Sequence, residues 1–263
     1  MSIVTFLPER LLAHVRHVFI KEKDFVIAHS WDELDTIIRQ KPVTALILDP
    51  AADGVMNVDA VVSLLKNYPS LPVVAYVVLN PASFGAIAKL SRQGLENILL
   101  QRFEDSPPRF RETVEHARAD PMKRDMLDAL RPHLDLLPVK LVSTVDAMFE
   151  APHEYRSAID VARSAEMSAV RLYRNFTLAG LGSPKRVLCA AKLLRAFGYL
   201  GDRGYSVREV AKKVGYRNSR IFAEHTADAF GLTPSRVRSH LRAEEVIERL
   251  MAWITANGSN GEG

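Results

Sequence analysis

Two matched pairs of short helices constrain the fold of this chain more than any other feature. The pairs are predicted over residues 157–176 and 206–230, each with a turn between its two helices. A serine or an asparagine stands before each of the four helices, where its side chain can accept from free backbone N–H groups. The turn in each pair is predicted to swing the second helix across the first.

The apolar residues of each second helix fall on one stripe. Leu172 and Phe176 share a face of the first pair, as Phe222 and Phe230 do in the second, so the residues between them face outward. Both pairs end in a Ser/Thr-Pro step, which is typical of the start of a further helix. Two matched units about fifty residues apart indicate an internal repeat.

The most distinctive stretch is Val-Gly-Tyr-Arg-Asn-Ser-Arg-Ile-Phe at 214–222, followed by Ala-Phe-Gly-Leu-Thr-Pro at 229–234. On these motifs, residues 137–242 resemble an AraC-type DNA-binding domain, in which two helix-turn-helix units are joined by a long helix, here about 184–200. The resemblance implies an all-α C-terminal domain that binds double-stranded DNA in the major groove.

The resemblance also implies which residues of the first unit contact DNA. Arg174 could pair with a guanine edge and Val170 could contact a thymine methyl group, beside Tyr173 and Thr177 at base-reading positions. Helix starts would hold phosphates. The alternative is a solvated basic face. The candidates in this unit and at the start of the linking helix are Ser168, Val170, Arg171, Tyr173, Arg174, Thr177, Lys185 and Arg186.

The second unit departs from the family pattern. Arg217, Ser219 and Arg220 suit DNA, but Glu224 stands where a basic residue is usual, and Asp228 follows one turn later. Glu224 could accept from a cytosine, whereas phosphates would repel Asp228. We therefore expect the first unit to do most of the reading, while the second binds weakly, tolerates bending or contacts protein.

The N-terminal part alternates predicted strands and helices. Short apolar runs over 2–7, 25–28, 45–49, 72–79 and 97–100 are separated by helical patterns. Such alternation predicts a five-stranded parallel sheet covered on both faces. Residues 1–119 resemble a response-regulator receiver domain with the flavodoxin-like α/β arrangement, which places function at the carboxyl ends of the strands.

The receiver chemistry is incomplete in this sequence. Asp49 matches the phosphoacceptor position, but the acidic pair that would hold magnesium falls at Leu7-Pro8. The hydroxyl position is Val77 and the lysine position is Gln101. Magnesium prefers several oxygen ligands. We interpret residues 1–119 as a pseudo-receiver, with Asp49 a relic or a local capping group, used for dimerisation, partner binding or control of the C-terminal domain.

Composition and charge agree with two domains of different roles. Residues 1–120 hold 13 Lys/Arg against 15 Asp/Glu, whereas residues 121–263 hold 22 against 16. A basic half beside a slightly acidic one favours nucleic-acid contact by the second half. The single cysteine, Cys189, fits a reducing cytosol. No run reaches membrane length and no signal peptide is recognisable, so we expect a cytoplasmic protein.

The domains are predicted at residues 1–119 and 137–256. A linker with one short helix would occupy 120–136, and 257–263 would form a disordered tail. Residues 236–254 are predicted as one helix, which either packs on its own domain or forms a dimer contact.

Three functions remain open. The first is a sequence-specific DNA-binding transcription regulator, with a homodimer expected and with no cofactor, metal or catalytic residue. The second is a protein-interaction adaptor or anti-regulator whose grip on DNA is weakened. The third is a phosphorylation-controlled response regulator that acts through Asp49.

Overall fold

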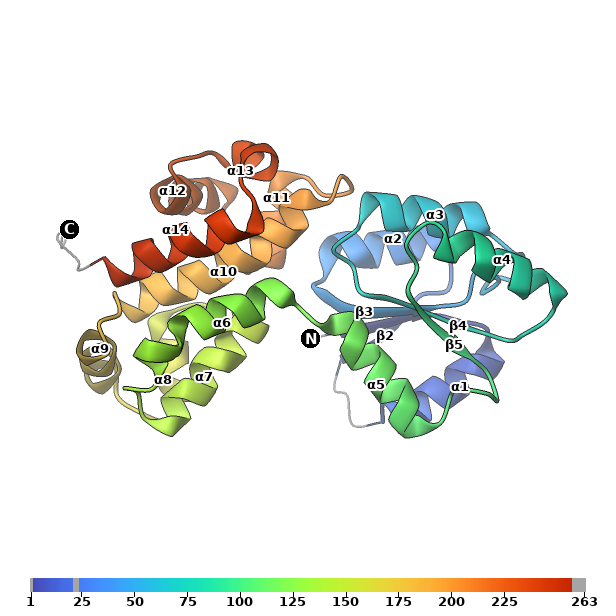
Figure 1. The fold of residues 1–263 in the computed structure, drawn as a ribbon, viewed down its shortest axis with the longest axis horizontal. Coiled ribbons are helices and arrows are strands. Elements are labelled where there is room, and N and C mark those ends of the chain that lie inside the picture. Colours follow the sequence, from blue (N-terminus) through green and yellow to red (C-terminus); the bar gives the residue numbers. More distant parts are fainter. Residues whose placement is uncertain (1, 21–23, 257–263) are drawn as a thin grey trace. The chain divides into compact units, whose positions relative to one another are not determined.

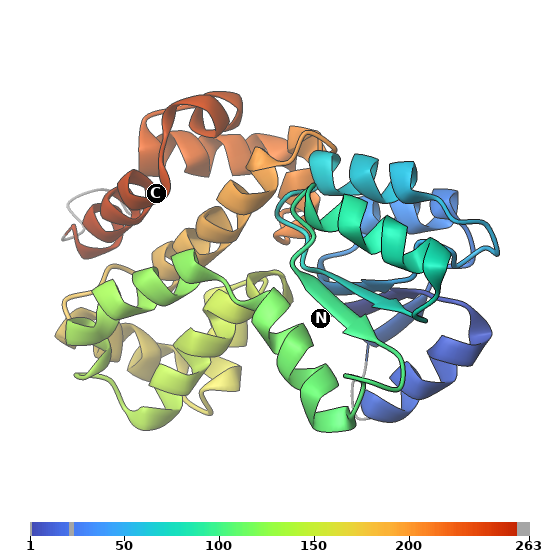
Figure 2. The ribbon, with the colours of Figure 1, turned by 45° about the vertical axis from the view of Figure 1, so that its right-hand side comes forward.

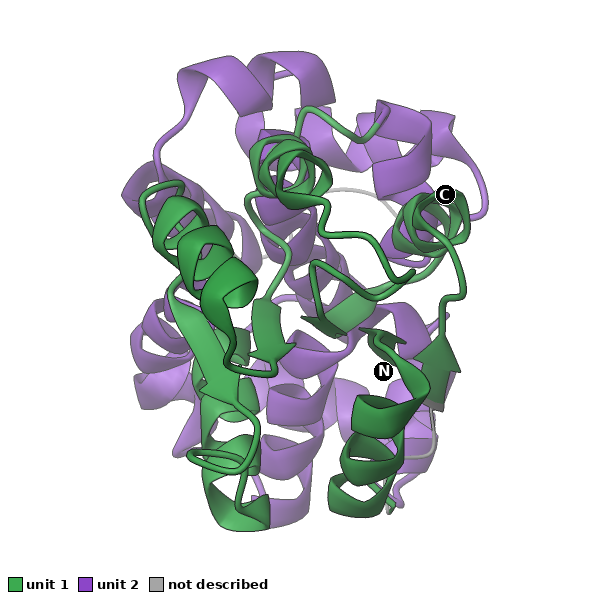
Figure 3. Cartoon of the chain, turned by 90° about the vertical axis from the view of Figure 1, so that its right-hand side faces the viewer, with its two compact units in different colours: residues 1–119, 202–205 green, residues 120–201, 206–263 purple. Residues whose placement is uncertain are grey.

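The computed structural model describes residues 2–20 and 24–256, so the predicted tail at 257–263 lies outside the described residues. Contacts divide the chain into two compact units, drawn in green and purple in Figure 3. Unit 1 comprises residues 1–119 and 202–205, and unit 2 comprises residues 120–201 and 206–263.

Unit 1 is built on a parallel sheet with the strand order β2-β1-β3-β4-β5 (Figure 1). This is the flavodoxin-like order, so the predicted fold class is confirmed. The strands are β1 (Ser2–Phe6), β2 (Asp24–Ile27), β3 (Val43–Leu48), β4 (Val73–Val77) and β5 (Asn97–Leu100).

Helices cover both faces of this sheet, with α1 and α5 on one face and α2, α3 and α4 on the other (Figures 1 and 2). Because helices cover both faces, every residue of β3 and β4 is buried, and all are apolar except Thr44 and Tyr76, whose hydroxyls donate hydrogen bonds. The helices are α1 (Glu9–Val18), α2 (Trp31–Gln40), α3 (Val58–Asn67), α4 (Pro81–Ser91) and α5 (Pro107–Arg118).

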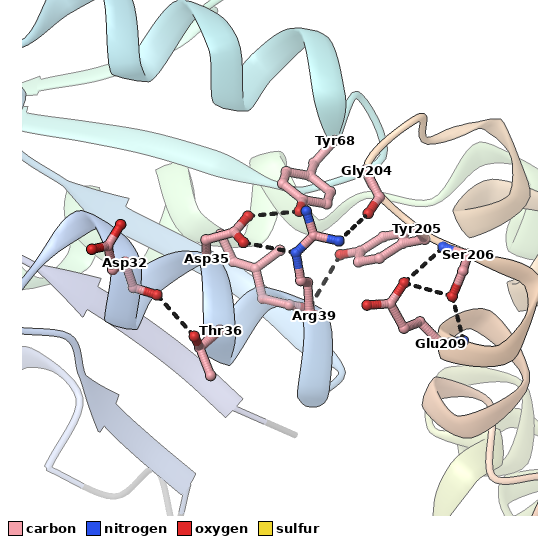
Figure 4. A network of polar contacts seen from close by, with 10 residues as sticks. Asp32, Asp35, Thr36, Arg39, Tyr68, Gly204, Tyr205, Ser206 and Glu209 are labelled. Carbon is pink, nitrogen blue, oxygen red and sulfur yellow. Dashed lines mark hydrogen bonds and ion pairs between the residues drawn. The ribbon is translucent and has the colours of Figure 1, made fainter.

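Residues 202–205 are remote in sequence from the rest of unit 1 but belong to it by their contacts. The Asp202 carboxylate accepts hydrogen bonds from the backbone N–H of Ser70, at 2.9 Å, and from its hydroxyl. Nη1 of Arg39 donates to the carbonyl of Gly204 at 2.8 Å (Figure 4). These polar contacts hold the segment at the ends of α2 and α3.

Aromatic packing completes the attachment of residues 202–205. The rings of Tyr205 and Tyr68 lie 4.8 Å apart between centroids, and both side chains are buried. The Tyr68 hydroxyl donates to Asp35 at 2.8 Å, and the Tyr205 hydroxyl donates to the carbonyl of Ile38 at 3.3 Å (Figure 4). Asp202 and Tyr205 are therefore part of the packed interior of unit 1, whereas Arg203 between them is exposed.

Unit 2 is all-α and is organised around its longest helix, α10, which contacts every other α-helix of the unit. Most of α10 is buried, as expected for a central helix. The helices are α6 (Pro121–Leu134), α7 (Val139–Glu150), α8 (Ala158–Ser164), α9 (Ala169–Leu178), α10 (Pro184–Gly201), α11 (Val207–Lys213), α12 (Ser219–Phe230), α13 (Pro234–His240) and α14 (Ala243–Thr255), with a 3₁₀ turn at Pro152–Glu154.

The prediction of one helix over residues 236–254 is wrong, because the chain breaks between α13 and α14. Leu241 and Arg242 are both extended, and the side chain of Leu241 is buried. The Glu245 carboxylate accepts from the backbone N–H of Arg242 at 2.9 Å and caps the start of α14. This segment has no glycine or proline to signal the break.

The apolar stripe of α14 packs inside unit 2. Val246, Leu250 and Ile254 are fully buried, and α14 contacts α6, α10 and α12. Helix α6 itself occupies most of residues 120–136, where a linker with one short helix was predicted. It continues through Pro132, which lies in its last turn, where a missing N–H interrupts little of the remaining helix.

Candidate nucleic-acid interface

The first helix pair, α8 and α9, is tightly capped. The Asp160 carboxylate accepts from the backbone N–H groups of Arg156, at 2.9 Å, and Ser157, at 3.1 Å. These bonds hold the pKa of Asp160 below its usual value. The turn that follows contains Glu166 with a φ of 51°, a left-handed conformation that reverses the chain into α9.

One face of α9 is buried and the other is open to solvent. Leu172 and Phe176 are buried, whereas Val170 is 81% exposed and Tyr173 is 45% exposed. Five predicted contact residues therefore share the open part of the helix surface: Val170, Arg171, Tyr173, Arg174 and Thr177.

The predicted phosphate contacts at helix starts differ in their surroundings. The Ser168 hydroxyl accepts from the backbone N–H of Arg171 at 3.3 Å, so Ser168 is the N-cap of α9. Lys185 is exposed at the start of α10.

Arg186 is partly buried against the end of α14. Its Nη1 donates to the carbonyls of Trp253 and Ala256, each at 3.3 Å. The guanidinium carbon lies 5.4 Å from the centroid of the Trp253 ring. Arg186 thus binds the end of α14, a contact that the sequence alone did not indicate.

The glycine-rich segment that follows α9 is fixed by burial and by a backbone hydrogen bond. Gly180 has a φ of 71°, Leu181 is buried, and the N–H of Gly182 donates to the carbonyl of Ile254 at 2.6 Å. The C-terminal helix therefore supports the end of the first candidate recognition helix.

The second helix pair, α11 and α12, repeats the capping of the first. Ser206 and Glu209 form a reciprocal capping box at the start of α11, with the Ser206 N–H donating to the carboxylate at 2.7 Å. Asn218 caps α12 by accepting from the N–H of Arg220 at 2.8 Å. The turn between them needs Gly215, because its φ is 84° and an added Cβ would lie 2.9 Å from Cα of His153.

The four predicted DNA contacts of the second pair, namely Arg217, Ser219, Arg220 and Glu224, are all exposed. Two of them bind each other, since Nε of Arg220 lies 2.9 Å from Oε1 of Glu224. One turn later, the Asp228 carboxylate accepts from Nε1 of Trp253 at 3.1 Å. Asp228 therefore connects α12 to α14.

The two candidate recognition helices belong to the same unit and lie on different sides of α10 (Figure 1). Between them is a cavity of about 1130 Å³, lined by Tyr173 of α9 and by Ile221 and His225 of α12. Lys192 of α10 also lines it, and sequence reasoning missed this residue. The available signal was its spacing of seven residues from Lys185, which places both lysines on one face of α10.

Asp49 lies directly after β3 in unit 1 and is buried. Its Oδ1 accepts from the backbone N–H of Ala51 at 2.8 Å, and burial raises the pKa of its carboxyl. Within residues 2–20 and 24–256, no group of three or more His, Cys, Asp or Glu side chains is placed to hold a metal ion.

No helix among the described residues combines the length and the apolar character that crossing a bilayer requires. The lone cysteine, Cys189, is buried, and its Sγ lies 3.4 Å from Nδ1 of His225. Burial raises the pKa of the Cys189 thiol, which disfavours the reactive thiolate.

Residues 161–240 match a protein family described as "Helix-turn-helix domain". The match spans α9, α10, α11, α12 and α13 and most of α8, so this segment forms an AraC-type helix-turn-helix domain. It supports a DNA-binding transcription regulator. No curated protein matches the chain significantly.

Two solved structures show a weaker overall likeness. Full-length FixJ from B. japonicum is 14% identical over 82% of this chain and 98% of its own, with a TM-score of 0.38. The xylose-binding transcription activator XylR is 14% identical over 90% of this chain and 69% of its own, with a TM-score of 0.34. At these TM-scores neither likeness bears on function.

Proposed function

With an AraC-type helix-turn-helix domain at residues 161–240, we propose that this chain is a sequence-specific DNA-binding transcription regulator without enzymatic activity. The observation that carries the proposal is the division of α9 into two faces. Leu172 and Phe176 anchor the helix in the core, while Val170, at 81% exposure, and the exposed Arg174 remain available to bases. A helix anchored in this way can enter the major groove without unfolding.

Within this function, α9 reads bases. Arg174 donates two hydrogen bonds to a guanine edge, Val170 contacts a thymine methyl group, and Tyr173 and Thr177 contact neighbouring base edges. Ser168, Arg171 and Lys185 hold phosphates, which fix the register of the helix on the duplex. We assign Arg186 only a weak phosphate contact, because the C-terminal carbonyls already accept from its guanidinium.

Helix α12 contributes less specificity. Arg217 and Ser219 contact phosphates near the start of the helix, where free N–H groups add attraction. Arg220 is partly neutralised by Glu224, so it binds DNA only when the pair opens. A contact of Glu224 with a cytosine would need the same opening.

The receiver-like domain acts without phosphorylation. Asp49 is buried, and its raised pKa opposes both ionisation and attack on a phosphodonor. The acid pair, hydroxyl and lysine of the receiver pattern are replaced by Leu7-Pro8, Val77 and Gln101, so the sequence supplies no cage for magnesium and no cation for an aspartyl phosphate. We assign the domain to dimerisation or to the binding of a signal or a protein partner. The protein works in the cytoplasm.

The adaptor is the second candidate function, favoured by the two carboxylates on α12. Glu224 is exposed on the surface that would face DNA, and it offsets the charge of Arg220. An adaptor would bind a protein through this surface. Its binding to duplex DNA would be weak and would lack the steep salt dependence of phosphate neutralisation.

Sequencing of genomic fragments captured by the purified protein tests the proposal. A shared motif in the captured fragments, lost by Arg174→Ala and kept by Arg131→Ala on α6, is the expected result. Absence of enrichment over bulk DNA, together with a shallow salt dependence, would replace the regulator with the adaptor. A magnesium-dependent mass gain at Asp49 with a small phosphodonor would instead establish the phosphorylation-controlled response regulator.

A further inference from the structure

The cavity between the two helix-turn-helix units is strongly basic. Its walls come from α8, α9, α10, α11 and α12, all within unit 2. The described residues that line it include no aspartate and no glutamate. Its five cationic residues are Arg156, Lys185, Lys192, Lys212 and Arg217.

Four of these cations are exposed at the mouth, but Lys192 is only 5% exposed. A buried ammonium normally has a charged partner, because removal from water is costly. Within the described chain, no carboxylate forms an ion pair with Lys192. Its Nζ has a long 3.5 Å contact to the carbonyl of Gly215 and lies 5.4 Å from the centroid of the Tyr216 ring.

Two acidic groups of the protein act on the charge of Lys192, namely the Cys189 thiol and the Asp160 carboxylate, and burial disfavours the thiolate form of Cys189. Asp160 is the carboxylate whose charge acts on Lys192, but its oxygens already accept from the N–H groups of Arg156 and Ser157 at the start of α8. Burial lowers the pKa of Lys192, and an anion in the cavity would offset this effect. The size of the cavity, the positive charge of its lining and the incompletely hydrogen-bonded Lys192 ammonium therefore all indicate an anionic ligand.

We propose that this cavity is a binding site for a phosphate group, with Lys192 as the buried cation and Arg156, Lys185, Lys212 and Arg217 around the mouth. Phosphate suits several converging lysine and arginine donors. Two sources can supply it. One is a free phosphate-bearing small molecule, which the cavity volume accommodates. The other is the DNA backbone between the segments read by α9 and α12, and this source alone rests on the proposed function.

The first arm of the test uses inorganic phosphate and the full chain without DNA, at ionic strength matched with chloride. The imidazole signals of His153 and His225, which line the cavity, are followed by NMR. A saturable shift of both signals is expected for a free ligand, with affinity reduced at least about tenfold in Lys192→Met and retained in Lys192→Arg. His133, whose Nδ1 contacts the carbonyl of Ala179 outside the cavity, serves as the internal control.

The second arm measures affinity for a captured DNA site at several salt concentrations. If the backbone fills the cavity, Lys192→Met lowers affinity about tenfold and reduces the salt slope by about one. Lys66→Met removes an exposed lysine of α3 and provides the matched control. Circular dichroism and thermal melting of each variant show whether it is folded.

The two arms separate the possible outcomes. A saturable phosphate shift lost in Lys192→Met, with DNA affinity unchanged, establishes a free ligand. Loss of DNA affinity without a phosphate shift establishes the backbone, and both effects together establish a shared site. A folded Lys192→Met variant that alters neither overturns the proposal. If the protein binds no DNA, the regulator fails, and the phosphate arm alone decides whether the cavity is an anion site.

Discussion

Nε of Arg220 donates to Oε1 of Glu224 across one turn of α12, at 2.9 Å, and these side chains are 84% and 58% exposed. An exposed pair of this kind contributes little to stability. Its larger effect is on binding, because it places a negative charge beside an arginine that would otherwise be available to DNA.

Glu224→Gln is therefore expected to raise affinity for DNA about three- to tenfold, a change of about 0.6–1.4 kcal/mol. The substitution removes one negative charge and releases Arg220 to contact phosphate. Fluorescence anisotropy with a labelled duplex measures the effect. Glu248→Gln, an exposed site on α14, is the control. A loss of affinity confined to sites with a particular cytosine would show instead that Glu224 reads a base.

Arg174→Ala is expected to weaken binding to the captured site by about 1–3 kcal/mol and to relax preference at one base pair. The physical reason is the loss of two hydrogen bonds to a guanine edge. Competition with single-base variants of the site measures this preference. A uniform loss across all sequences would show that Arg174 contacts only phosphate.

Arg186→Ala is expected to destabilise unit 2 by about 1–2 kcal/mol, because hydrogen bonds to two C-terminal carbonyls and the contact with Trp253 are lost. Urea unfolding measures the free energy. The exposed neighbour provides the comparison: Lys185→Ala should leave stability unchanged and weaken DNA binding. Equal stability of the two variants would contradict a structural role for Arg186.

Asp49→Asn is expected to raise the melting temperature at pH 7 by about 2–4 °C. The folded-state pKa of Asp49 is raised, so the folded state holds this proton more tightly than the unfolded state does. The resulting contribution to stability is present in acid, falls as pH rises from the ordinary aspartate pKa through the raised one, and is absent above it. Asparagine keeps an acceptor for the Ala51 N–H but carries no charge to desolvate.

Thermal melting of the wild type and Asp49→Asn across this pH range tests the sign. The advantage of the variant should shrink as the pH is lowered. A variant that is less stable than the wild type at pH 7 would mean that the ionised carboxylate has a stabilising partner.

Gly204→Ala is expected to destabilise unit 1 by about 1–3 kcal/mol. A methyl group at this position would overlap the ring of Tyr68, which is buried, packs on Tyr205 and donates to Asp35. Chemical denaturation followed by tyrosine fluorescence would measure the loss. Gly201→Ala is the control, because its added Cβ meets no atom within 4 Å.

Much of the fold could be predicted because its signals are local. The alternation of apolar runs and helical patterns predicted the parallel sheet, and the Leu172/Phe176 stripe predicted which face of α9 is buried. The break before α14 could not be recognised in the same way. It depends on the burial of Leu241 and on a cap from Glu245, in a segment without proline or glycine.

The details of the candidate site depend on tertiary contacts, which sequence spacing does not reveal. Arg186 and Asp228 were judged as surface charges facing DNA, but both contact Trp253 once α14 packs on the unit. Lys192 was not among the predicted site residues. Its burial becomes apparent only when the helix pairs on both sides of α10 are in place.

The membership of residues 202–205 in unit 1 has a consequence for dissecting the protein. A fragment ending at residue 119 would lack these residues, so Ser70 would lose the Asp202 carboxylate, Arg39 would lose the Gly204 carbonyl, and the Tyr68 ring would be uncovered. The packing of unit 1 is thus completed by residues that are synthesised about a hundred residues after its last strand. During translation, the N-terminal domain reaches its final packing only after the first helix-turn-helix unit has been made.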